Sequence, residues 1–275
     1  MQANDVNDPL ALCSAHAIEK EGFAEIKAVI SNVGYPKIIG AVSVINHFFG
    51  RDHIKLGAYK GTFGDTFSGG MGGALMNYLI VCNLFMVNLV GKYVDDLVDS
   101  FPSPVKDYNS VDDAVETIKK TLTEAEDNTI VYVAIGFMIN LRDFLATDEN
   151  KALFAQKVNV VFIMGGQYVP ESKTPEFNFG CGVWDGEETY SNTDECKGSA
   201  KAAVENIPES VPVRFVGFEL SEDVWTGGSL WSWCKAYSHK NPCFRALQDW
   251  TIATGNKTTL SWDPMTVTAA AGSAM

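Results

Sequence analysis

The stretch "KVNVVFIMGG" (residues 157–166) contains five consecutive apolar residues and ends in two glycines. A continuous apolar run of this kind, without the alternation of a half-exposed strand, is typical of a strand buried on both faces of a parallel sheet. Two further stretches have the same pattern, "NTIVYVAIG" (128–136) and "VPVRFVGFEL" (211–220). We therefore expect these three stretches to be strands of one buried sheet.

Helical stretches separate and precede these strands. Apolar residues recur at helical spacing in "DDAVETIKKTL" (112–122), "INLRDFLA" (139–146) and "GSAKAAVENI" (198–207). Nearer the start of the chain we expect a helix over 10–19, a strand over "AEIKAVIS" (24–31) and a helix over "IIGAVSVINHFFGR" (38–51). This alternation predicts an α/β fold with an open, mainly parallel sheet and helices on both faces. Ligands of such sheets bind beyond the carboxyl ends of the strands.

Composition limits the possible partners. The chain has 275 residues, of which 46% are hydrophobic, and its formal net charge is -13. We expect a single domain over 1–275, since this length suits one large globular unit. The acidic balance argues against a nucleic-acid or anionic-membrane surface, which needs clustered Lys and Arg. A neutral small molecule or a cation is the easier partner. The start of the chain lacks the pattern of a secretory leader, which slightly favours a cytoplasmic location.

One apolar segment breaks the α/β pattern. Residues 74–91 carry no charge and reach the length of roughly 18 residues that a membrane span requires. Asn77, Asn83 and Asn88 interrupt the run, so a membrane span is the less favoured interpretation. We expect a buried helix, or an insertion foreign to the fold near 66–91.

The six cysteines are scattered and form no CxxC pair, so a zinc site is weakly supported. A disulfide between Cys181 and Cys196, or between Cys234 and Cys243, could close a loop in an oxidising compartment. Free thiols are the favoured expectation.

Polar side chains cluster where the predicted strands end. They lie in Asn4 to Asp8, at Asn32, in "PEFNFG" (175–180) and in "SWDP" (261–264). Aspartates within one loop, joined by a distant Asp, suit a hard cation such as Ca²⁺, and Asn and Glu suit the hydroxyls of a sugar. Each also has a structural interpretation: Asn32 in a turn or helix cap, Glu176 as a solvated loop charge, and Asp263 as a helix cap.

Five stretches of the chain, taken in their order, resemble one enzyme family. The stretches "NDVNDPLAL" (4–12), "VAIGFMINL" (133–141), "FIMGG" (162–166), "EFN" (176–178) and "WDPMTV" (262–267) are similar to the inosine-uridine preferring nucleoside hydrolases. The likeness is to the branch whose late motif reads Trp-Asp-Pro. It implies hydrolysis of the N-glycosidic bond of ribonucleosides to ribose and free base, in purine or pyrimidine salvage, with a Ca²⁺-bound water as nucleophile. A homodimer or homotetramer is also implied.

The resemblance assigns roles to individual residues. It implies that Ca²⁺ is bound by Asp8, by Asp263 and by the main-chain carbonyl of Ile139. It implies that the ribose hydroxyls are held by Asn32, Glu176 and Asn178. Trp262 stands where some members have a histidine that protonates the leaving base, and ring stacking by Trp262 or Trp225 could aid its departure instead.

Departures from the family pattern leave an alternative open. Asn7 stands at the position of the family's catalytic base, where a carboxamide cannot usefully accept a proton from water. The family's first strand and one metal ligand are expected to be missing, as is the usual end of the chain. Asp5 could supply the ligand, and Asp5 or Asp8 could serve as the base. The alternative is a catalytically impaired paralogue that binds ribose or nucleosides without turnover.

Overall fold

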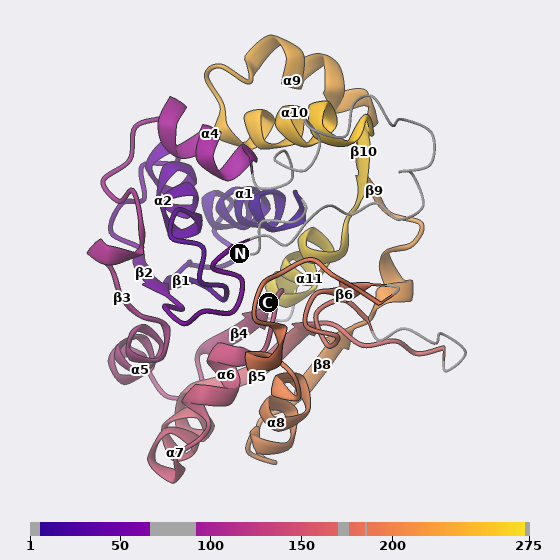
Figure 1. Cartoon of the computed structure of the whole chain (residues 1–275). Helices are drawn as coiled ribbons and strands as arrows, with labels where there is room; N and C mark the ends of the chain where they lie inside the picture. Colours follow the sequence, from indigo (N-terminus) through magenta and orange to yellow (C-terminus); the bar gives the residue numbers. More distant parts are fainter. Residues whose placement is uncertain (1–5, 67–91, 170–175, 185, 273–275) are drawn as a thin grey trace.

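The computed structural model describes residues 6–66, 92–169, 176–184 and 186–272 (Figure 1). The apolar segment 74–91 and Asp5 lie outside these ranges, so the predictions made for them stay predictions. Within the described residues, no helix is both long enough and apolar enough to cross a membrane.

Two three-stranded parallel sheets form the centre of the fold (Figure 1). In the first, β1 (Ala28–Ser31) pairs with β2 (Lys55–Ala58), which pairs with β3 (Asp112–Asp113). In the second, β4 (Ile130–Ala134) pairs with β5 (Val158–Met164), which pairs with β8 (Val213–Val216). Two antiparallel pairs are peripheral, β6 (Val183–Trp184) with β7 (Glu187–Glu188) and β9 (Trp225–Gly227) with β10 (Thr258–Leu260).

Helices follow most of the strands. The α-helices are α1 (Asn7–Lys20), α2 (Ile38–Phe48), α4 (Lys92–Ser100), α5 (Ala114–Glu124), α6 (Ile139–Phe144), α7 (Asp148–Lys157), α8 (Ser199–Asn206), α9 (Trp231–Tyr237), α10 (Pro242–Thr254) and α11 (Trp262–Gly272). Short 3₁₀ turns are η2 (Tyr108–Ser110), η3 (Thr193–Glu195), η4 (Phe218–Ser221) and η5 (Gly228–Leu230).

Successive residues of β5 are buried in different layers. Val161 and Ile163 pack in the cluster that contains residues of α5, α6, α7 and α8, which we call the α5 face. Val160 and Phe162 pack with Ala270 of α11 on the opposite side, the α1 face. The period of two in side-chain direction therefore gives both faces of the strand an apolar partner. This confirms the predicted α/β fold with helices on both faces of a parallel sheet.

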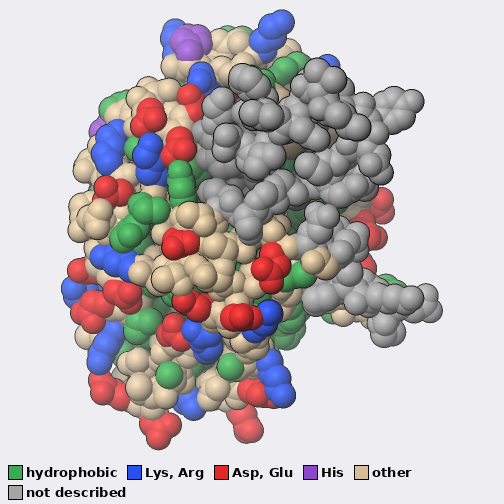
Figure 2. Space-filling model, in the orientation of Figure 1, with side chains coloured by type: hydrophobic (Ala, Val, Ile, Leu, Met, Phe, Trp, Pro, Cys, Tyr) green, Lys and Arg blue, Asp and Glu red, His purple; other side chains and the backbone are tan. Residues whose placement is uncertain are grey.

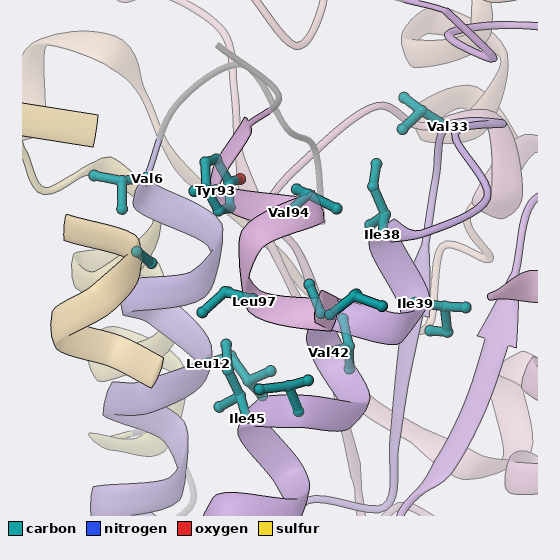
Figure 3. Close-up of a cluster of buried hydrophobic side chains, with 14 of the residues drawn as sticks. Val6, Leu12, Val33, Ile38, Ile39, Val42, Ile45, Tyr93, Val94 and Leu97 are labelled. Carbon is teal, nitrogen blue, oxygen red and sulfur yellow. The ribbon is translucent and has the colours of Figure 1, made fainter. Parts of the chain in front are cut away.

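The largest of the buried clusters includes residues of α1, α2, α4 and α10 (Figure 3). Ile38, Val42 and Ile45 recur at helical spacing along α2 and meet Leu12 of α1 and Leu97 of α4, all of them buried. The run of apolar residues that predicted a helix over 38–51 is thus buried on nearly every side of α2, and the helix ends at Phe48. Burying a Leu or Ile side chain contributes roughly 1.5–3 kcal/mol.

Other sequence signals fix the ends of the helices. The Asp113 side chain accepts from the main-chain N–H of Val115 and caps α5. Asn241 caps α10 in the same way, with Pro242 in the first turn and Gly255 in the left-handed conformation after the last.

Two predicted elements differ from the structure. The strand expected over 24–31 is limited to β1, because the polar residues of its first half lie at the surface. The expected single sheet is divided between β1 and β4, which are not paired with each other.

Two disulfides overturn the expectation of free thiols. Cys181 is bonded to Cys196, one of the two pairs considered from the sequence. The other pair is wrong, because Cys243 is bonded to Cys13 and Cys234 is a buried free thiol. The Cys13–Cys243 bond ties α1 to α10 across a separation of 230 residues. Sequence spacing cannot reveal such a pairing, because the fold alone brings these two helices together.

The two disulfides should stabilise the fold unequally. The chain-entropy model gives about 5 kcal/mol for closing a loop of some 230 residues and about 3 kcal/mol for one of some 15. We expect the double variant Cys13→Ser/Cys243→Ser to lose more unfolding free energy than Cys181→Ser/Cys196→Ser. Guanidinium denaturation of both variants beside the oxidised parent chain measures the difference. An equal or smaller loss in the first variant would contradict the prediction.

A charged cluster joins α4 to α10. Arg245 Nη2 donates to Asp96 Oδ1 at 2.8 Å, and Arg245 Nε lies 3.2 Å from Asp249 Oδ1. Burial, followed by the nearby Asp96 carboxylate, raises the pKa of Asp249 to about 7. Two carboxylates thus share one guanidinium in a partly buried place, where the second negative charge is unfavourable.

The pH dependence of stability follows from this cluster. A carboxyl whose pKa is higher in the folded chain contributes stability below its unfolded pKa, and this contribution is lost as pH rises through the folded value of about 7. Between pH 4 and pH 8 we expect the parent chain to lose melting temperature relative to Asp249→Asn, which has no proton to lose there. Thermal denaturation of both chains across this range is the measurement, and parallel curves would contradict it.

Candidate active site at the carboxyl ends of the strands

Two buried amide side chains join the carboxyl ends of the two sheets. Asn140 Nδ2 donates to the main-chain oxygen of Ser31, the last residue of β1, at 2.8 Å. Asn32 Nδ2 donates to the main-chain oxygen of Phe137, just beyond β4, at 3.2 Å. Asn32 Oδ1 is buried and accepts no hydrogen bond from the described residues. The hydrogen bond of the Asn32 side chain joins residues that are 105 positions apart in the chain. Asn32 therefore does not serve the local turn or helix cap considered from the sequence.

Asn178 extends this linkage to β5. Its Nδ2 donates to the main-chain oxygen of Met164, the last residue of β5, at 3.0 Å. The same Nδ2 lies 3.5 Å from the main-chain oxygen of Ile135, at the end of β4. The predicted sugar residues Asn32 and Asn178 therefore lie at carboxyl ends of strands in the two sheets, where an α/β fold binds its ligands.

Glu176 lies in a nest of main-chain N–H groups. Its carboxylate accepts from the N–H groups of Asn178, Gly166 and Phe179 at 2.9, 3.1 and 3.1 Å. The side chain is only 3% exposed, so the interpretation as a solvated loop charge is wrong. Burial raises the pKa of the Glu176 carboxyl above its ordinary value, while these hydrogen bonds act in the opposite direction.

A glycine allows this nest to form. A Cβ atom on Gly165 would lie 2.4 Å from the ring of Phe179 and 3.3 Å from the Glu176 carboxylate. The glycine pair that follows Met164 thus allows close packing, and it lets the loop over 176–179 lie against the strand end.

Asp8 and Asn7 are in the first turn of α1 and are almost completely buried. Asp8 lines the same cavity as Asn32, Phe137 and Asn140. Asn7 Nδ2 lies 3.5 Å from Thr259 Oγ1 in β10, the strand that precedes α11. The start of α1 is therefore between the strand ends and the start of α11.

The late motif begins α11. Asp263 is 5% exposed and lies within the first turn of the helix rather than before it, so it does not cap the helix from outside. Trp262 Nε1 donates to the main-chain oxygen of Phe218 at 3.2 Å, and the two rings stack with centroids 5.5 Å apart. One face of the Trp262 ring is thus occupied by Phe218, just beyond β8.

Ile139 is the first residue of α6 and is fully buried. The residues predicted to bind the metal are consequently at the starts of three helices, α1, α6 and α11, of which α1 and α11 pack closely together. No group of three or more His, Cys, Asp or Glu side chains suited to a metal occurs within the described ranges.

Sequence reasoning missed Asn140 and Thr259. Asn140 follows Ile139 in the quoted motif, but only the fold shows that its amide reaches across to β1. Thr259 had no distinguishing signal, since a threonine in a short strand is ordinary.

Comparison of the chain with protein-family models gives no match. No curated protein matches it either. Solved structures do: an inosine-guanosine nucleoside hydrolase has 17% identity over 98% of this chain and 76% of its own, with a TM-score of 0.63. A plant nucleoside hydrolase has 17% identity over the same shares, with a TM-score of 0.58. The type III effector XopQ, solved in complex with adenosine diphosphate ribose, has 14% identity over 97% of this chain and 78% of its own, with a TM-score of 0.63.

These likenesses extend over nearly the whole chain and agree with each other. At such low identity they show the fold alone, which is that of the nucleoside hydrolases. They support the family resemblance at the level of fold, and not the particular branch.

The amide linkage leads to a stability prediction. Removing the Asn140 amide leaves the buried carbonyl of Ser31 with only the hydrogen bond from the main-chain N–H of Tyr59, and the loss of one such bond costs about 0.5–1.5 kcal/mol. Asn150→Ala is the matched control, because Asn150 Nδ2 donates to the buried main-chain oxygen of Phe144 within the α6–α7 region. We expect Asn140→Ala and Asn150→Ala to lose similar stability in urea. Only Asn140→Ala should speed amide hydrogen exchange beyond β1 and β4, and equal exchange in the two variants would contradict this.

Proposed function

We propose that this chain hydrolyses the N-glycosidic bond of ribonucleosides, releasing ribose and the free base. The observation that carries the proposal is the set of buried acidic and amide side chains at the carboxyl ends of the strands, in a fold that the chain shares with nucleoside hydrolases. Buried polar side chains of this density are costly unless they have partners, and a polyhydroxylated sugar supplies such partners.

The sugar would be bound at the ends of β1 and β5. Asn32 Oδ1 is a buried acceptor that can take a hydrogen bond from a ribose hydroxyl. The Glu176 carboxylate and the Asn178 amide lie next to the end of β5, and each retains acceptor capacity. Their negative and dipolar oxygens would also stabilise positive charge that develops on the sugar ring as the glycosidic bond lengthens.

The donor set suits Ca²⁺ as the proposed cofactor. Asp8 and Asp263 are buried carboxylates in the first turns of α1 and α11, and the Ile139 carbonyl supplies a further oxygen. Hard cations take all-oxygen ligand sets of this type. Bound Ca²⁺ would orient a water molecule and lower its pKa. Asp8 and Asp263 would hold the metal at the side of the site where α1 meets α11.

Proton removal from that water depends on the residue beside Asp8 in the first turn of α1. Asn7 is buried beside Asp8, and its carboxamide cannot act as a general base near neutral pH. Asp8 is the nearest described carboxylate along the chain, but it is also a proposed metal ligand.

A second candidate follows from Asn7. The same pocket could bind a ribose-containing ligand without hydrolysing it. The effector XopQ has this fold and was solved with adenosine diphosphate ribose, which contains ribose. A binding protein would need the sugar contacts of Asn32, Glu176 and Asn178 but no catalytic base.

Release of free base from inosine and uridine in the presence of Ca²⁺ separates the two candidates. For the hydrolase we expect slow but measurable turnover by the parent chain and an increase on the order of 10²- to 10⁴-fold in Asn7→Asp, because that is the usual contribution of a general base; for the binding protein we expect no turnover by the parent chain. Isothermal titration with Ca²⁺ should show one site that Asp263→Asn abolishes. Asp127→Asn is the control, since this exposed carboxylate precedes β4 at the opposite end of the sheet.

Each outcome has a defined meaning. Strong turnover by the parent chain would show that Asp5 or Asp8 serves as the base. Inactivity of both chains, with inosine still bound and with binding weakened by Asn178→Ala, would favour the second candidate. Normal Ca²⁺ binding by Asp263→Asn would contradict the proposed metal ligand.

A further inference from the structure

The turn that links α10 to β10 carries Asn256 and Lys257, and Thr258 begins the strand (Figure 1). Asn-X-Thr, with X other than proline, is the acceptor triplet for N-linked glycans. It occurs once in the 275 residues. Because such triplets also arise by chance, its use has to be judged from the structure around Asn256 and from the compartment in which the chain folds.

The structure leaves the Asn256 side chain available. Gly255 ends α10 in the left-handed conformation, and Asn256 follows as an exposed residue. Its main-chain N–H donates to Thr254 Oγ1 at 3.1 Å, whereas its carboxamide makes no hydrogen bond to the described residues. The backbone of the turn is thus fixed, and a sugar on Asn256 Nδ2 would break no hydrogen bond of the described fold.

The neighbouring strand also leaves room at the triplet. Gly227 of β9 pairs with Thr258, and the main-chain N–H of Gly228 donates to the oxygen of Lys257 at 2.8 Å. A Cβ atom on Gly227 would lie 2.3 Å from that oxygen, so the two backbones meet closely here. Because both partners of the triplet are glycines, no side chain of theirs stands in the way of a glycan.

The cysteines supply an independent observation. Cys13 is bonded to Cys243, and Cys181 is bonded to Cys196. Disulfides persist in secreted proteins and in the oxidising lumen of the secretory route, and are rare where cytosolic reductants maintain thiols. N-linked glycans are a mark of secreted proteins as well. The disulfides and the exposed triplet therefore belong to the same compartment, which differs from the cytoplasmic location slightly favoured by the sequence.

We propose that Asn256 is a modification site and carries an N-linked oligosaccharide, attached in an oxidising secretory compartment. The donor class is an oligosaccharide linked through diphosphate to a lipid. Asn256 Nδ2 forms a bond to the anomeric carbon of the first sugar, and the bond from that carbon to the diphosphate oxygen breaks. The lipid diphosphate leaves with the electron pair, and Nδ2 gives up one proton to a base of the transferase.

The glycan would lie outside the candidate active site. β10 leads from the triplet to Ser261 and the start of α11, where Asp263 lies. A strand of three residues spans about 10 Å, so Asn256 and Asp263 are at opposite ends of β10. The modification therefore does not depend on the proposed hydrolase activity.

The first test uses the protein captured by antibody from the cells that produce it. Peptide-N-glycosidase in heavy-oxygen water converts a glycosylated asparagine to labelled aspartate. Trypsin cleaves after Arg245 and Lys257, which gives a peptide of residues 246–257 whose one asparagine is Asn256. We expect labelled aspartate in most copies of this peptide. Unmodified asparagine in the peptide before enzyme treatment, in most copies, would overturn the proposal.

The second test uses variants of the full chain, secreted by a eukaryotic host behind a cleavable leader. Thr258→Ser retains the acceptor triplet, whereas Thr258→Val and Asn256→Gln remove it. We expect a glycosidase-sensitive mass shift of one glycan in the parent chain and in Thr258→Ser, and its loss in the other two. No shift in the parent chain, or a shift retained in Asn256→Gln, would overturn the assignment. Asn256→Gln should melt with the deglycosylated parent chain, because the carboxamide has no hydrogen bond to the described residues.

The third test examines the compartment separately. The captured protein is denatured and alkylated before any reduction. The cysteines of the two disulfides should resist alkylation until a reductant is added, whereas Cys234 should react at once. Free thiols at Cys13 and Cys243 in the captured protein would overturn the oxidising compartment, and with it the modification. None of these measurements involves a nucleoside.

Discussion

The hydrogen bond from the Asn140 amide to the carbonyl of Ser31 connects two sheets that share no main-chain ladder in the described structure. In a continuous parallel sheet, main-chain hydrogen bonds align the strand ends, and side chains are not needed for it. Here β1 and β4 are not paired. Hydrogen bonds donated by the side-chain amides of Asn140 and Asn32 join the regions at their carboxyl ends. Both amides are buried, where a hydrogen bond is strong and its loss is costly. These bonds therefore help to align the carboxyl ends of β1 and β4.

The same end of the sheet gathers polar groups that elsewhere would be unfavourable. Glu176 is tolerated because three main-chain N–H groups point at its carboxylate, and Asn178 because two strand ends accept its amide hydrogens. The rest of the surface differs in character: on the face drawn in Figure 2, Lys and Arg side chains are interspersed with Asp and Glu.

The parts of the fold that the sequence could predict are those that depend on local pattern. The apolar run over 158–164 and the helical spacing over 38–48 are sufficient to identify β5 and α2, because burial on both faces leaves the same signature wherever it occurs. The site residues were predicted from their order along the chain, which no periodicity could supply. The Cys13–Cys243 bond, the Asn140 amide and the division between β1 and β4 were missed. Each depends on which segments meet in three dimensions, and residues 230 positions apart carry no local trace of their contact.

The division of the sheet also explains how α1 is held. A helix at the ligand end of an α/β sheet is usually fixed by the strand that leads into it and by the layer beneath it. In the described structure α1 is held from other directions, by close packing on α11 and by the disulfide from Cys13 to α10. Because Asp8 and Asn7 are in the first turn of this helix, their positions depend on α10 and α11 as much as on the strands. Residues that never touch a ligand, such as Cys13 and Cys243, would therefore influence the geometry of the site through the placement of one helix.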